Sequence, residues 1–272
     1  MAFKKREQKK QDVGKFMQDL ESGVKEVFES GRYQEYLDFC SKFHNYSYGN
    51  IVLIMLQNPS ASQVASFTTW NKLGFKIKRG SKALKILCPV KYNTIVEEDG
   101  EEVVKNHLYF KLGSVFDISQ VEGDKPSLVS DLKGSSEEIK SLINYALNNT
   151  EVAITIDSSL NDGSANGYYD VLMNDIHIKE SLDDFHKLKT IIHELAHSML
   201  HSDLDNGLDR RTKEVQAESV AYIVCRGLGL NTDDYSFGYV ASWSKGKELQ
   251  ELKDSLSVIN KTSQKILDFF QK

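Results

Sequence analysis

Two histidines one helical turn apart are the strongest chemical signal in this sequence. They stand in the run His193-Glu194-Leu195-Ala196-His197. Histidines at positions i and i+4 lie on the same face of a helix, so both imidazoles can reach one metal ion, as a zinc site requires. Glu194 can face the open coordination position and accept a proton from a zinc-bound water. The run therefore predicts a zinc centre with Glu194 as its catalytic base.

A centre of this kind needs a third protein ligand. A histidine ten residues after His193 is one known solution, but Asp203 stands at that position. The next expected helix carries Glu214 and Glu218 on one otherwise apolar face. Burial of a carboxylate on such a face is costly unless the carboxylate is paired or binds a metal. We expect Glu214 to be the third ligand and Glu218 to orient a ligating histidine. The exchanged roles of the two glutamates stay open.

Two other features lie close to this motif. His201 extends the same helix face by one turn. We interpret it as a histidine that interacts favourably with the helix dipole at the C-terminus of the helix. The segment Asp175–Lys179 is predicted to be a strand that holds an extended peptide by edge pairing. A metal that polarises a carbonyl, together with a base, suits hydrolysis of a peptide bond.

The spacing of apolar residues predicts the elements that position these groups. Helices are expected at about 9–30, 33–43, 50–57, 136–148, 182–201, 211–228 and 249–270, and short strands at 152–156, 167–172 and 175–179. Residues 84–96 and 102–118 flank an Asp99-Gly100 turn and predict a β-hairpin. We expect an α+β fold, with a connection between two domains at 121–136.

The charge is divided unevenly along the chain. The net charge is -5, yet residues 1–92 hold 16 basic and 8 acidic residues, and residues 43–92 hold seven basic and no acidic ones. Basic side chains neutralise phosphates and aromatic rings stack on unpaired bases, so this composition predicts binding of a single-stranded nucleic acid. A solvated basic face over an aromatic core is the alternative. The candidate residues are Tyr46, Tyr48, Trp70, Lys76, Lys78, Arg79, Lys82 and Lys85.

The sequence contains no candidate for a membrane segment or a secretory signal. The longest apolar run, residues 51–56, is far shorter than the ~20 residues that span a bilayer. Cys40, Cys88 and Cys225 are odd in number and lack metal-type spacing, which favours reduced thiols. We therefore expect a cytoplasmic protein without a membrane partner.

Several motifs resemble a known family in their order along the chain. Those that resemble the N-terminal domain of ArdC-type antirestriction proteins are Tyr46–Asn50, Trp70–Gly74, Lys78–Gly80, Pro89 and Val115–Gln120. The run His193–His197, followed by Glu214–Cys225, resembles the zinc metallopeptidase domain of those proteins and of the ImmA/IrrE group.

The resemblance implies an ArdC-like domain that binds single-stranded DNA (8–122) and a zincin-like metallopeptidase domain (136–230). Residues 231–272 are expected from their helical spacing to form a C-terminal helical extension, and the resemblance does not cover its helix. The resemblance also implies a protein of plasmids, integrative elements or phages that protects transferred DNA from restriction enzymes. Its zinc ligands would be His193, His197 and Glu214, with Glu194 as the base and a protein as its substrate. Two alternatives stay open: a non-catalytic protein that coats single-stranded DNA around a structural metal, and a regulatory protease that cleaves a repressor.

Overall fold

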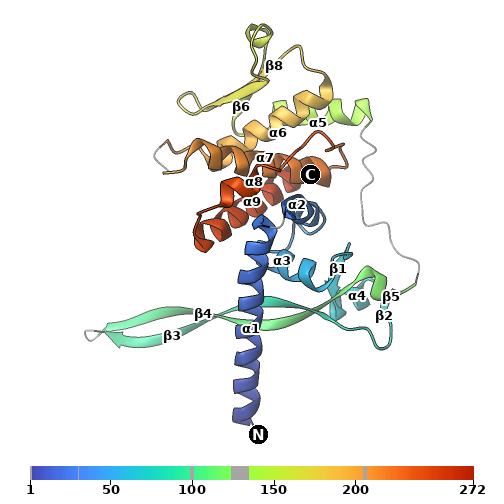
Figure 1. Cartoon of the computed structure of the whole chain (residues 1–272), viewed down its shortest axis with the longest axis vertical. Helices are drawn as coiled ribbons and strands as arrows, with labels where there is room; N and C mark the ends of the chain where they lie inside the picture. The colour runs from blue at the N-terminus through green and yellow to red at the C-terminus, as the bar shows by residue number, and fades with distance from the viewer. Residues whose placement is uncertain (1, 30, 99–100, 124–134, 205–206) are drawn as a thin grey trace. The chain divides into compact units, whose positions relative to one another are not determined.

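The computed structural model describes residues 2–29, 31–98, 101–123, 135–204 and 207–272 (Figure 1). The chain forms two compact units, each made of two stretches of sequence. The first unit holds residues 1–25 and 49–126, and the second holds residues 26–48 and 127–272. The three-domain division at 8–122, 136–230 and 231–272 stays a prediction, and both 26–48 and 231–272 belong to the second compact unit.

The helices of the first unit pack through a close approach of backbones. α1 (Ala2–Glu29) carries a stripe of apolar residues, whereas α3 (Tyr48–Gln57) is almost entirely apolar and has five consecutive buried residues from Ile51 to Met55. A Cβ atom at Gly23 would lie 2.7 Å from side-chain atoms of Val52 and Leu56. Glycine at this position therefore allows α1 to pack directly against α3.

The predicted hairpin is present and forms the largest sheet of the first unit. β3 (Leu84–Glu98) and β4 (Glu101–Asp117) pair antiparallel along their whole length, and β1 (Val64–Ser66) pairs with the end of β4. β2 (Lys76–Ile77) and β5 (Val121–Glu122) form a second, two-stranded sheet. α4 (Phe67–Lys72) and the 3₁₀ turn Ile118–Gln120 lie beside them.

A three-stranded sheet and a set of helices build the second unit. The strands are β6 (Ala153–Asp157), β7 (Gly167–Asp170) and β8 (Asp175–Lys179), in the order β6-β8-β7. The helices are α2 (Tyr33–Lys42), α5 (Ser136–Asn149), α6 (Asp184–Leu200), α7 (Arg210–Gly227), α8 (Val240–Ser244) and α9 (Leu249–Phe270). The expected α+β fold is confirmed, and no helix in the described ranges is long and apolar enough to cross a bilayer.

Two aspartate caps fix the first turns of α6 and α7, the helices that carry His193, His197 and Glu214. The side chain of Asp183 accepts the backbone N–H of His186 at the start of α6, and Asp209 accepts that of Thr212 at the start of α7. Such caps stabilise a helix by about 1 kcal/mol and set its first turn. α6 packs against α7, and α7 packs against α9.

Candidate metal centre

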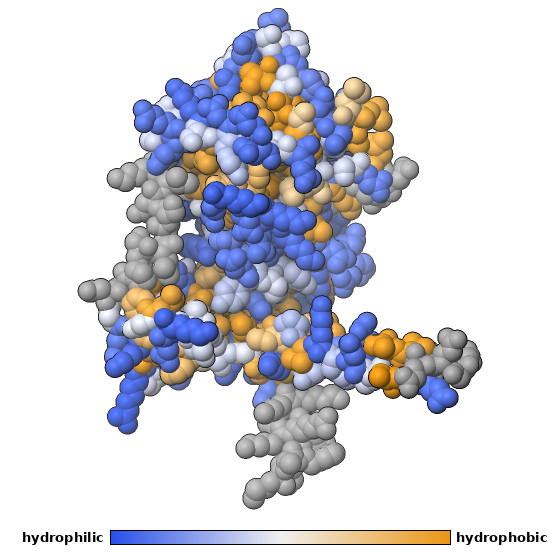
Figure 2. Space-filling model, turned by 180° about the vertical axis from the view of Figure 1, so that it is seen from behind, coloured by the Kyte–Doolittle hydropathy of each residue, from blue (hydrophilic) through white to orange (hydrophobic). Residues whose placement is uncertain are grey.

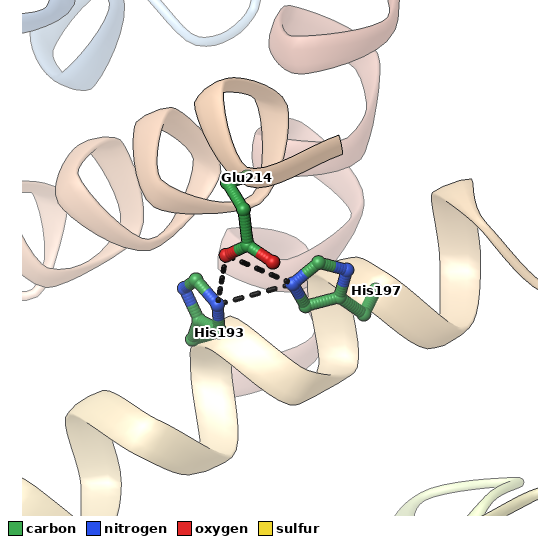
Figure 3. Close-up of side chains that lie close together, drawn as sticks. All are labelled: His193, His197 and Glu214. Atoms are coloured by element: carbon green, nitrogen blue, oxygen red, sulfur yellow. Dashed lines mark hydrogen bonds and ion pairs between the residues drawn. The ribbon is translucent and has the colours of Figure 1, made fainter. Parts of the chain in front are cut away.

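Three side chains from α6 and α7 converge on one point (Figure 3). The Nε2 atoms of His193 and His197 lie 3.1 Å apart. Oε2 of Glu214 lies 3.6 Å from Nε2 of His193 and 3.8 Å from Nε2 of His197. The structure thus brings together the two histidines and the glutamate that the sequence singled out.

These distances fit a tetrahedral metal ion. An ion about 2.0–2.1 Å from each ligand atom separates those atoms by about 3.3–3.4 Å. The three observed separations lie on both sides of that value. Two imidazoles and one carboxylate are also a ligand set that zinc takes in catalytic sites, where a fourth position stays open. In the part of the chain that the structure describes, this is the group of ligands that meets the geometry of a metal site.

The electrostatics of the centre favour a cation between the side chains. Burial acts to lower the pKa of His193, but hydrogen bonds with Glu214 and Glu218 outweigh it and raise this pKa to about 9. Hydrogen bonds with His193 and His197 hold the pKa of Glu214 far below its ordinary value. A bound metal would take the place of the proton on His193, because the ligand imidazole must be neutral.

Glu194 is buried beside this cluster. Its side chain is 7% exposed, and burial raises its pKa although the charges of His193 and His197 act in the opposite direction. The backbone of Tyr169 in β7 forms a hydrogen bond with its carboxyl group. A carboxylate with a raised pKa, held in one orientation, has the properties of a general base.

Glu218 lies on the other side of the His193 ring. Its Oε2 atom is 3.3 Å from Nδ1 of His193, the ring nitrogen that faces away from the other ligands. A carboxylate at this nitrogen fixes the tautomer of a ligating histidine and raises its basicity. The geometry therefore favours Glu214 as the ligand and Glu218 as the orienting group.

His201 has a partner that the sequence interpretation did not foresee. It is buried, at 4% exposure, and its Nδ1 atom lies 2.9 Å from Nδ1 of His197. Its Nε2 atom lies 3.0 Å from Oε1 of Gln216, whose amide donates to Ser255 in α9. The spacing i, i+4, i+8 of the three histidines was the available signal, whereas nothing in the sequence indicated Gln216 or Ser255.

The strand expected to bind a peptide by its edge is not at an edge. β8 pairs with β6 on one side and with β7 on the other, so its backbone groups are already used in the two ladders. β6 and β7 are the two outer strands of this sheet, and β7 is the one whose Tyr169 backbone contacts Glu194. The free edge next to the centre therefore belongs to β7.

The candidate DNA-binding residues do not form one cluster. Trp70 is 1% exposed, and its indole donates to the carbonyl of Phe116 within a core that includes Ile118 and Val121. An unpaired base cannot reach this ring, so Trp70 is a core residue and leaves the DNA-binding set. Tyr46 and Tyr48 are half-buried and belong to the second unit, unlike the basic residues.

The basic residues lie at the surface of the first unit. Lys76, Lys78, Arg79 and Lys82 are exposed, and Lys85 is half-buried. The ammonium groups of Lys78 and Lys85 donate to the carbonyl of Ser119 and the hydroxyl of Ser114. Gly74 and Gly80, with φ of 86° and 84°, form the turns on either side of this segment.

Known proteins resemble both parts of the chain. A crystal structure of the metal-free antirestriction protein ArdC from the R388 plasmid has a TM-score of 0.52, with 24% identity over 82% of this chain and 83% of that one. Its Mn(II)-bound structure covers the same shares with a TM-score of 0.46 and 21% identity. An uncharacterized protein of Bacillus anthracis is 26% identical over 311 aligned residues. That alignment covers 99% of this chain and 53% of the relative, so the chain spans about half the length of that protein.

Two families match separate stretches of the sequence. Residues 7–116 match the N-terminal domain of anti-restriction factor ArdC. Residues 151–225, which contain all the residues of the metal centre, match the IrrE N-terminal-like domain of the peptidase M78 family. The chain is therefore ArdC-like, with an ArdC-type N-terminal domain followed by an IrrE N-terminal-like domain.

Proposed function

We propose that this chain is an antirestriction protein of a mobile genetic element that binds single-stranded DNA and hydrolyses peptide bonds at a zinc centre. The convergence of His193, His197 and Glu214 beside the buried Glu194 carries the peptidase part. The ArdC-type match over residues 7–116 and the exposed basic segment 76–82 support the part that concerns DNA.

The ligand set supports a catalytic rather than a structural metal. Structural zinc sites are closed by four protein ligands, whereas catalytic sites have three and leave one position open. Within the described residues the group contains three ligand atoms. When bound, zinc would polarise the scissile carbonyl and lower the pKa of a water ligand.

The residues around the ligands have separate tasks in this proposal. Glu194, with its carboxyl held by the backbone of Tyr169, takes up the proton of the attacking water and then passes it to the leaving amine. The outer edge of β7, which pairs with no other strand in the described ranges, would receive an extended peptide next to this carboxyl. Glu218 keeps His193 in the orientation that a ligand needs.

Cleavage of a peptide library tests the peptidase part. We would incubate the zinc-loaded full chain with unstructured peptides from a digested proteome and identify new termini by mass spectrometry. We expect the native chain to cleave peptides and Glu194→Gln to be at least a hundredfold slower, with zinc still bound, because a general base contributes about 10²–10⁴ in rate. Equal rates would exclude Glu194 as the base, and no cleavage by the native chain would favour a structural metal.

A binding titration tests the part that concerns DNA. We would compare a labelled single-stranded oligonucleotide with the duplex of the same sequence, using the full chain and one salt concentration. Tighter binding of the single strand is the expected result. A preference for the duplex would contradict the proposal and favour a regulatory protease that acts at a repressor.

A further inference from the structure

The outer part of the long hairpin carries an uncovered cluster of aromatic rings. In this part of β3 and β4, Tyr92 pairs with His107 and Val90 pairs with Tyr109. Positions two apart along a strand lie on the same face, so all three rings share one face of the ribbon. Tyr92 is 47% exposed and Tyr109 is 50% exposed. From this face we propose a second element of the DNA interface: a platform on which unpaired bases stack.

The rings of this platform already stack on one another. The ring centroids of Tyr92 and His107 are 4.9 Å apart with planes inclined by 19°, and those of Tyr92 and Tyr109 are 5.8 Å apart at 67°. The side chain of Thr94 lies 2.7 Å from Nε2 of His107, which fixes the orientation of that ring. A nucleic-acid base can therefore add to a stack whose geometry is set before binding, which lowers the entropy cost of binding.

The part of the ribbon that carries the rings has basic residues and no acidic ones. Residues 84–96 and 103–116 hold four lysines, whereas the acidic residues of β3 and β4 stand next to the turn (Glu97, Glu98, Glu101 and Glu102) and at the end of β4 (Asp117). Lys105 and Lys111 are exposed and share the face of the three rings, because they pair with Thr94 and Cys88. They are six positions apart on β4, about 20 Å along the strand, so they lie at the two ends of the platform.

These features favour single-stranded DNA over duplex. An aromatic face stacks on bases only where they are unpaired, and lysines at both ends can neutralise phosphates of the same strand. This inference rests on the proposed function. It adds a site that contains none of the DNA-binding residues predicted from the sequence. It places base stacking on the ribbon, whereas those candidates place it on Tyr46, Tyr48 and the buried Trp70.

The opposite face of the ribbon has a different character and supplies a control. Ile95 pairs with Val104 there, and both are exposed, at 66% and 56%. Figure 2 shows hydrophobic side chains gathered at the outer end of the ribbon, next to the grey atoms. Exposed apolar side chains of this kind suit a protein partner better than a phosphate backbone.

Fluorescence anisotropy with labelled oligothymidylate tests the platform in the full chain. Tyr92→Ala combined with Tyr109→Ala should weaken binding at least tenfold, since stacking on one base contributes about 1–3 kcal/mol. Tyr92→Phe with Tyr109→Phe should bind within about twofold of the native chain, because phenylalanine keeps the stacking face. Ile95→Ala with Val104→Ala should leave the affinity unchanged. The exposed positions allow all these variants to fold, which circular dichroism checks.

Charge neutralisation provides a second measurement. Lys105→Gln with Lys111→Gln should reduce the slope of log K against log salt by about 1.4, the value for two phosphates of a single strand. If the native chain binds oligothymidylate and the double alanine variant at Tyr92 and Tyr109 binds it equally well, these rings are not a base-stacking platform, and the proposed function stands. Equal losses in that variant and in the Ile95 and Val104 control would also overturn the platform. If the native chain does not bind at all, the proposed DNA function itself fails.

Discussion

The Nδ1 atom of His197 lies 2.9 Å from the Nδ1 atom of His201, inside the protein. A histidine that binds a metal through Nε2 carries its proton on Nδ1, so His197 donates and His201 accepts in that state. Nε2 of His201 then donates to Oε1 of Gln216, whose amide group donates to Ser255. The four side chains form a chain of hydrogen bonds with one direction, and it fixes the ring of His197.

Removal of His201 should therefore weaken metal binding without removing a ligand. We expect His201→Ala to reduce zinc affinity about 10–100-fold, the usual cost of losing a partner that orients a ligand. A chelator competition titration measures it. His186→Ala, on the same helix but bonded to the Asp183 cap, is the matched control and should bind zinc as the native chain does. Equal affinities of the two variants would contradict this role.

The two glutamates of α7 should differ in their effect on the metal. Glu214→Gln replaces the ligand and should lower zinc affinity by more than about a hundredfold, beyond the range for orienting groups. Glu218→Gln should lower it by about 10–100-fold, because His193 loses only the partner of Nδ1. The same competition titration orders them, and a larger loss for Glu218→Gln would exchange their roles.

The basic segment of the first unit should control the salt dependence of DNA binding. Replacement of Lys78, Arg79 and Lys82 by glutamine should reduce the salt slope for single-stranded DNA by about 2, at roughly 0.7 per phosphate contact. Binding titrations at several salt concentrations give this slope. A matched triple variant at the exposed Lys245, Lys261 and Lys265 of the second unit should retain the native slope. An unchanged slope in the first variant would remove the segment from the interface.

Asp117 should make the first unit less stable in acid. Burial acts to raise its pKa, but hydrogen bonds from Ser119, Ser62 and Gln63 outweigh burial and lower it. A lowered folded-state pKa means that the carboxylate stabilises the fold above the unfolded value of ~4, and that this stability is lost as the pH falls. Asp117→Asn should lower the free energy of unfolding by about 1–3 kcal/mol at pH 7.

Urea unfolding at pH 7 and at about pH 3.5 measures this effect. In a Trp243→Phe background the fluorescence of Trp70 reports on it, because the indole of Trp70 donates to the carbonyl of Phe116, next to Asp117. The difference between Asp117→Asn and the native chain should shrink at the lower pH. The exposed Asp162→Asn is the control and should match the native chain at both. A difference that stays constant with pH would contradict the assigned cause.

The metal centre could be predicted because its ligands follow local rules. His193 and His197 are one helical turn apart, and the carboxylates of the next helix stand in an apolar sequence, so both signals are visible without the fold. The sequence favours Glu214 over Glu218 as the ligand but leaves the exchanged roles open, since both glutamates lie on the same helix face, and the distances to the two nitrogens of His193 favour the expected assignment. The partner of His201 comes from α7 and Ser255 from α9, contacts that no spacing along one helix indicates.

The helices and strands could be predicted from the sequence better than the burial of their side chains or the order of the strands. The hairpin and most of the helices followed from periodicity and turn residues, with ends that differ by a few residues. Composition gave no information on which aromatic rings are covered: Trp70 fills a core, while Tyr92 and Tyr109 are about half exposed. Likewise β8 was expected at an edge, but strand order depends on long-range pairing with β6 and β7.

The zinc content of the purified full chain is the most direct test of the metal centre. We would measure the metal by mass spectrometry after dialysis, in the native chain, in Glu194→Gln and in His197→Ala. We expect one zinc ion per native chain and per Glu194→Gln chain, and less than about a tenth of that in His197→Ala, because one ligand is lost. A native chain without stoichiometric zinc, or a His197→Ala variant that retains it, would contradict the metal centre.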